Sequence, residues 1–166
     1  MTYYILFFIE IGTRRVSLAG ITRHPDADWM EQVARNATMQ DSDYLNGCHY
    51  LLNDRDQKFC REFRETLAAG VKCLPLPARS PNLNAYAERW VRSIKEECLS
   101  KLILFEEMSL QRVVSNYLAH YYQERNHQGK DNRWLFPVAA REASERDVIH
   151  CRERLGGLLK YYSRAA

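Results

Sequence analysis

The chain opens with two apolar segments that have the period of β-strands. Residues 3–9 form an almost continuous run of aromatic and aliphatic side chains, and residues 15–21 alternate between apolar and polar positions. Gly12 and Thr13 lie between the two segments and favour a turn. The pattern predicts an antiparallel hairpin at the start of a sheet.

Most of the remaining apolar positions have helical spacing. Trp29, Val33 and Ala37 recur every four residues after Asp26, which suits a helix start. Helices are expected over about residues 26–40, 59–70, 84–102 and 109–124, and short strands over residues 49–53 and 71–74. This order of elements is that of an α/β protein with a mixed sheet flanked by helices.

Composition bounds the class of protein. With 166 residues, 46% of them hydrophobic and 27% charged, the chain is typical of one soluble globular domain with a real core. The net charge of +3 is too small to establish a nucleic-acid partner, although the region after Arg141 is locally basic. No run reaches the roughly 20 apolar residues that span a bilayer, and the first run lacks the basic leader of a secretory signal, so no membrane partner is expected.

Cysteine and histidine usage adds little chemistry. The five cysteines are odd in number and have no C-x-x-C spacing, so the sequence contains no zinc motif or disulfide framework. Small buried thiols and a cytoplasmic location are therefore expected. His49 has no second histidine at metal-binding spacing and is expected to be a satisfied structural residue.

Two acids stand where a metal site could form. Asp54 directly follows the strand predicted over residues 49–53, and ligands gather beyond the carboxyl ends of strands in α/β sheets. Mg²⁺ takes carboxylate oxygens, usually only one or two from the protein. Asp56 competes with Asp54 for this role, although a helix cap is its simpler interpretation.

Glu88 lies early in the helix that follows the turn at residues 80–82, which Asn82 or Asn84 is expected to cap. Arg92 and Lys95 follow at four and seven residues and share its helix face. This face suits a metal ligand beside a polyanion, but taken alone a solvated face with ion pairs is the simpler interpretation.

Four ordered motifs then resemble a known family. They are residues 8–16, residues 53–59, residues 84–89 and the tyrosine-rich run at residues 120–127. They resemble the integrase core domain of retroviral-type integrases and insertion-sequence transposases, and the resemblance extends over roughly residues 3–135.

The resemblance implies a ribonuclease-H-like fold and DNA strand transfer that depends on Mg²⁺ or Mn²⁺. In that family an Asp-Asp-Glu triad holds the metals, and Asp54 and Glu88 match its second and third members. The resemblance also implies that Arg92 and Lys95 hold DNA and that the protein works as a homo-oligomer. Arg125 and His127 are further candidates for DNA contact, or else they tie the end of the long helix to the next loop.

One member of the triad has no match in the chain. The family's first Asp lies on a strand before the one that residues 3–9 resemble, and no Asp precedes Asp26. The fold is therefore expected to be amino-terminally truncated, with a partial core over residues 1–135 and a basic extension over residues 136–166. Glu10 is a possible substitute ligand, or a solvated acid paired with Arg14 or Arg15.

Strand-transfer activity is accordingly expected to be impaired. Two alternatives remain: a non-catalytic remnant that only binds nucleic acid, and a nuclease of the same fold that cuts without joining.

Overall fold

The computed structural model describes residues 2–39, 44–45, 47–127, 131–136 and 148–165. The chain divides into two compact units. The first consists of Met1–Ile9 and Ser17–Ala87, and the second of Glu10–Val16 and Glu88–Ala166. Each unit is described by itself.

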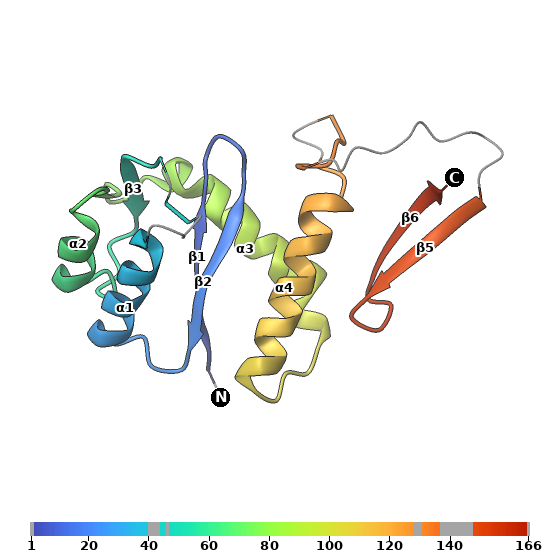
Figure 1. Cartoon of the computed structure of the whole chain (residues 1–166), viewed down its shortest axis with the longest axis horizontal. Coiled ribbons are helices and arrows are strands. Elements are labelled where there is room, and N and C mark those ends of the chain that lie inside the picture. The colour runs from blue at the N-terminus through green and yellow to red at the C-terminus, as the bar shows by residue number, and fades with distance from the viewer. Residues whose placement is uncertain (1, 40–43, 46, 128–130, 137–147, 166) are drawn as a thin grey trace. The chain divides into compact units, whose positions relative to one another are not determined.

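The predicted hairpin is confirmed. Strand β1 (Tyr4–Ile9) pairs with β2 (Val16–Thr22), and the turn between them is closed by backbone hydrogen bonds (Figure 1). The amide of Glu10 donates to the carbonyl of Arg15, and the amide of Arg14 donates to the carbonyl of Glu10, both at 2.8 Å. Arg14 has a positive φ of 68°, a conformation that helps the chain to reverse.

The predicted first helix is also confirmed. Helix α1 (Ala27–Thr38) begins where the carboxylate of Asp26 accepts a hydrogen bond from the amide of Trp29 at 2.9 Å. Its buried face consists of Met30, Val33, Ala34 and Ala37. This face packs into the core of the first unit.

The second half of the first unit repeats the strand–helix–strand pattern that the sequence predicts. Strand β3 (Tyr50–Asn53) leads to α2 (Arg61–Leu67) and then to β4 (Lys72–Pro75), and β3 and β4 pair in parallel. Helix α2 contributes Phe63 and Leu67, which are fully buried, to the same core as α1.

The strands of the described residues pair in three two-stranded sheets and not in one mixed sheet. The α/β class is confirmed, but the single mixed sheet is not seen. Within the first unit, β1 and β3 share the hydrophobic core through Phe8 and Leu51. The two pairs are thus joined by side-chain packing and not by a continuous ladder of hydrogen bonds.

Helices and aromatic side chains build the second unit. A 3₁₀ turn, η1 (Pro81–Asn84), leads into α3 (Ala85–Glu97), and η2 (Leu99–Lys101) leads towards α4 (Glu107–Gln123). Asn82 and Asn84 therefore lie within the 3₁₀ turn that precedes α3. Trp90 is buried, with its ring centroid 5.5 Å from that of Tyr117 and 4.9 Å from that of Tyr121.

A carboxy-terminal hairpin is an element that the sequence reading did not predict. Strands β5 (Val148–Arg154) and β6 (Leu159–Ala165) pair antiparallel (Figure 1). A turn at Gly156 and Gly157 joins them, and both glycines have positive φ. The predicted domain boundary at residues 135–136 stays a prediction, because residues 137–147 lie outside the described part of the chain.

Among the described residues, no helix is long and apolar enough to cross a membrane.

Candidate functional site

Asp54 lies at the carboxyl end of a strand, as the sequence predicts. It directly follows β3, and its side chain is exposed. One carboxylate oxygen, Oδ1, accepts a hydrogen bond from the amide of Asp56 at 3.0 Å. Oδ2 accepts none from the described residues, so one oxygen of Asp54 is available to a ligand.

Asp56 does not cap the helix that follows, and that prediction is wrong. Helix α2 begins after Cys60, which provides no side-chain cap. The Asp56 carboxylate instead accepts hydrogen bonds from the amide of Lys58 at 3.0 Å and from its ammonium at 2.8 Å. These bonds, the side-chain one above all, lower the pKa of Asp56. Asp56 therefore closes a local turn and is already paired with a cation.

Asn53 adds a polar group beside Asp54. Its side chain is only 6% exposed, and its Nδ2 donates to the backbone carbonyl of Asp54 at 2.7 Å. Its Oδ1 is buried without a hydrogen-bond partner in the described structure. A buried acceptor without a partner is costly, so this end of β3 has unused capacity to bind a donor or a cation.

Glu88 lies in the first turn of α3 and is exposed. Arg92 and Lys95 are also exposed, one and two turns further along the same helix. Within the described residues these three side chains form no ion pair with one another, so the ion-paired face that was the simpler alternative is not seen. These three side chains present one carboxylate and two cations to solvent.

The two predicted metal ligands belong to different units, Asp54 to the first and Glu88 to the second. Within the described residues, no group of three or more histidine, cysteine, aspartate or glutamate side chains is placed to hold a metal ion.

Glu10 is the third acid predicted as a metal ligand. Its carboxylate Oε2 accepts a hydrogen bond from the hydroxyl of Thr13 at 2.7 Å, while its backbone bonds to Arg14 and Arg15. This arrangement stabilises the hairpin turn. A metal-binding role for Glu10 stays a prediction.

Arg125 has an intramolecular partner that the sequence reading missed. Its guanidinium binds the carboxylate of Glu97, with Nη2 2.6 Å from Oε1 and Nε 2.9 Å from Oε2. The hydroxyl of Tyr117 donates to the same carboxylate at 2.8 Å. Burial opposes ionisation of Glu97, but the hydrogen bonds from Arg125 and Tyr117 outweigh it and lower the pKa of Glu97.

His127 ties the end of α4 to the loop that follows. Its side chain is buried, and its Nε2 lies 2.7 Å from the carbonyl oxygen of Tyr121. The contact matches the simpler of its two predicted roles. Both side chains already have partners within the second unit. DNA contact by Arg125 and His127 stays a prediction.

The comparisons with known proteins add one finding. Residues 69–133 match the family model described as the integrase core domain. This part of the chain is similar to the integrase core domain. No curated protein and no solved structure matches the chain significantly.

The matched segment, residues 69–133, includes all of α3 and α4, and therefore Glu88, Arg92 and Lys95. It also includes the pair of Glu97 and Arg125. Asp54 and Glu10 lie outside the matched residues, so their assignment depends on local geometry and on the motif resemblance alone.

Proposed function

We propose that this chain acts in DNA integration, as an integrase core that binds a divalent metal and DNA. The observation that carries the proposal is the integrase core match over residues 69–133, which includes the first turn of α3. There Glu88 is exposed on the same helix as Arg92 and Lys95. Asp54 at the end of β3 supplies the second acid.

The donor chemistry at these positions fits Mg²⁺ or Mn²⁺. Both ions prefer hard oxygen ligands, and Mg²⁺ usually takes only one or two carboxylates from a protein. Asp54 has an available carboxylate oxygen, Asn53 beside it has a buried acceptor without a partner in the described structure, and the Glu88 carboxylate is exposed. Asp54 and Glu88 would hold the metal, with Glu10 as a weaker third candidate. A bound metal would supply activation of the attacking oxygen and charge stabilisation at the phosphodiester.

The basic side chains supply the contacts to DNA. Arg92 and Lys95 would bind backbone phosphates, which position DNA without reading its sequence. Arg125 and His127 are weaker candidates, because each has a partner within the protein.

The finer features of the fold and assembly are part of the same proposal. A ribonuclease-H-like fold with one mixed sheet, a DNA partner and a homo-oligomeric state follow from the integrase core match and the motif resemblance. The shared core under β1 and β3 supports the single sheet, because strands of one sheet pack on common helices.

We further propose that the chain by itself joins DNA strands poorly. Asp54 and Glu88 match two members of a three-acid site, and two carboxylates support chemistry with two metals weakly. The alternative is a chain that binds nucleic acid and has no catalytic role. It is favoured by the extent of the family match, because only Glu88 of the proposed metal ligands lies within residues 69–133.

A joining assay tests the proposal. The full chain is incubated with Mn²⁺, a plasmid target and a fluorescent duplex that carries the DNA ends flanking its gene. We expect Mn²⁺ to tighten binding of the duplex, and we expect this effect to be lost in Asp54→Asn and Glu88→Gln. Little joined product should form.

Glu96→Gln is the matched control, because Glu96 is an exposed acid on the same helix as Glu88. If neither Mn²⁺ nor Glu88→Gln changed the affinity of the chain for the duplex, the result would support the non-catalytic alternative. Nicked products without joined ones would identify a nuclease. Robust joining that is lost in Glu10→Gln would give Glu10 the place of the third acid.

A further inference from the structure

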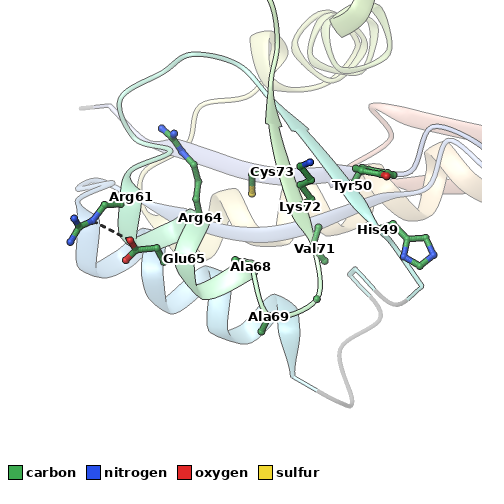
Figure 2. A pocket seen from close by; sticks show the side chains of 11 residues that line it. His49, Tyr50, Arg61, Arg64, Glu65, Ala68, Ala69, Val71, Lys72 and Cys73 are labelled. Atoms are coloured by element: carbon green, nitrogen blue, oxygen red, sulfur yellow. Dashed lines mark ion pairs between the residues drawn. The ribbon is translucent and has the colours of Figure 1, made fainter.

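An open hollow of about 760 Å³ lies in the first unit, where α2 ends and β3 and β4 begin. Figure 2 shows its side chains. Helix α2 contributes Arg61 and Glu65, strand β4 contributes Lys72 and Cys73, and Tyr50 begins β3. Ala68 directly follows α2, and His49 directly precedes β3. No role was predicted for this surface, and it is distinct from the end of β3 that carries Asp54.

The charge of the hollow is positive. Its lining includes three cations, Arg61, Arg64 and Lys72, and one carboxylate, that of Glu65. Arg61 Nε lies 3.3 Å from Glu65 Oε1, and both side chains are exposed. Such an exposed ion pair contributes little to stability, so another anion can readily replace Glu65 at Arg61. His49 is exposed and has no side-chain hydrogen bond to the described residues, so the expectation of a satisfied structural histidine is wrong.

One cation of the hollow is held in place. The guanidinium of Arg64 donates twice to the carbonyl of Phe59, from Nε at 2.9 Å and from Nη2 at 2.6 Å. Its Nη1 makes no hydrogen bond to the described residues. A guanidinium that is already oriented loses less conformational entropy when it binds a phosphate.

An exposed aromatic ring completes the surface. Tyr50 is 64% exposed, and Lys72 is its direct partner in the parallel register of β3 and β4. Side chains at paired positions point to the same face of a sheet, so the ring and the ammonium are neighbours. An exposed aromatic ring beside cations is the arrangement that stacks a base while phosphates are bound.

The hollow and Asp54 lie at opposite ends of the same strand. Tyr50 begins β3, and Asp54 follows its last residue. Four residues of strand place the two positions roughly 13 Å apart. A ligand in the hollow therefore does not need Asp54.

We propose that this hollow binds single-stranded nucleic acid, with Tyr50 stacking on a base and Lys72, Arg61 and Arg64 binding phosphates. Stacking needs an unpaired base, and this requirement favours a single strand over a duplex. The inference does not depend on metal binding or strand transfer at Asp54 and Glu88.

Fluorescence anisotropy with a short labelled oligothymidine, the full chain and no added metal tests the proposal. We expect Tyr50→Ala to raise the Kd about tenfold. We expect Lys72→Glu to weaken binding and to reduce the slope of log Kd against log salt by about 0.7, the value for one phosphate contact on a single strand. Arg61→Glu should weaken binding as well.

Two variants are matched controls. Tyr162 is 61% exposed on the carboxy-terminal hairpin, so Tyr162→Ala removes an equally exposed ring elsewhere. Arg35 pairs with Glu31 on α1 as Arg61 pairs with Glu65 on α2, so Arg35→Glu makes the same change of charge outside the hollow. Both controls should bind oligothymidine as the parent chain does, and circular dichroism verifies that all variants fold.

Equal Kd values for Tyr50→Ala and Tyr162→Ala would overturn the proposal. So would a duplex whose Kd rises in Tyr50→Ala as much as that of oligothymidine. Poly-glutamate that competes as well as an oligonucleotide of the same charge would overturn it too, and would indicate an acidic peptide as the ligand. Failure of the proposed integration function has a different signature: oligothymidine binding would remain sensitive to Tyr50, while Mn²⁺ and Glu88→Gln would have no effect.

Discussion

Cys98 and Cys151 have the same side chain in opposite surroundings. Cys98 directly follows α3 and is fully buried, and burial raises the pKa of its thiol to about 11. Cys151, by contrast, is exposed on β5. Because the thiolate is the reactive form, Cys98 should resist alkylation in the native protein.

We therefore expect iodoacetamide at neutral pH to label Cys151 and to leave Cys98 unmodified. Mass spectrometry of peptides measures both in one sample, and labelling after denaturation in urea is the control. Equal labelling of the two cysteines before denaturation would contradict the buried position of Cys98.

Trp90 is the side chain on which the aromatic core of the second unit depends. Its ring packs against Tyr117 and Tyr121, and only 3% of the residue is exposed. Trp90→Ala should lower the free energy of unfolding by about 3–5 kcal/mol, since it removes buried area and leaves a cavity.

Urea denaturation followed by circular dichroism measures this loss. Trp134→Ala is the comparison, because Trp134 is only partly buried and contacts Tyr161 in a single edge-to-face pair. If Trp90→Ala lowered the free energy of unfolding no more than Trp134→Ala does, the central role of Trp90 in the aromatic core would be contradicted.

At the scale of elements, one buried carboxylate attaches the carboxy-terminal hairpin to α4. The side chain of Glu124 is 2% exposed, and Arg154 of β5 binds both of its oxygens, with Nη2 2.7 Å from Oε1. His120 Nδ1 lies 3.0 Å from Oε2. A two-stranded hairpin is marginal alone, so these contacts supply much of its stability.

Glu124→Gln should release this hairpin, because it leaves the charge of Arg154 without its counter-ion. We expect faster amide hydrogen exchange in β5 and β6, with little change in α3. Glu153→Gln removes the exposed pair with Lys160 in the hairpin itself and should have little effect. Unchanged exchange in Glu124→Gln would show that other contacts hold the hairpin.

The same carboxylates make the second unit sensitive to acid. Burial opposes ionisation of Glu97 and Glu124, but hydrogen bonds from Arg125 and Tyr117 to the first, and from Arg154 and His120 to the second, lower the pKa of each below 4.5. A carboxyl group whose pKa is lower in the folded state stabilises it above the unfolded pKa. This stabilisation is lost as the pH falls through the folded pKa.

The urea midpoint should therefore fall as the pH is lowered below 4.5. In Glu97→Gln the midpoint should be lower at neutral pH and should depend less on pH. A parent chain with the same midpoint on both sides of pH 4.5 would contradict the paired state of these carboxylates.

At the scale of the whole molecule, DNA binding should depend on charge at α3. Arg92→Glu and Lys95→Glu should each weaken binding of unrelated duplexes equally, and each should reduce the salt slope by about 0.9. Arg112→Glu is the control, because it makes the same change of charge at an exposed position on α4. Anisotropy titrations over a range of salt measure the slopes, and equal slopes for all three variants would exclude α3 from the DNA interface.

Much of the local structure could be predicted from sequence. The first hairpin, α1 to α4, β3 and β4 follow from apolar spacing, caps and turns, because those signals lie within a few residues of one another. Asp54 at the end of β3 and Glu88 at the start of α3 were placed by the same local signals.

Only the tertiary structure decided how these elements are joined. Arg125 binds Glu97 and Arg154 binds Glu124, and about thirty residues separate the members of each pair, so no local pattern signals either contact. The hairpin of β5 and β6 was missed because its polar side chains carry no strand alternation, and because its partners, Glu124 and Trp134, lie far away in the sequence. Two further features depend on contacts between residues that are distant in the sequence: the pairing of strands in separate sheets and the hollow around Tyr50. The spacing of apolar residues does not specify such contacts.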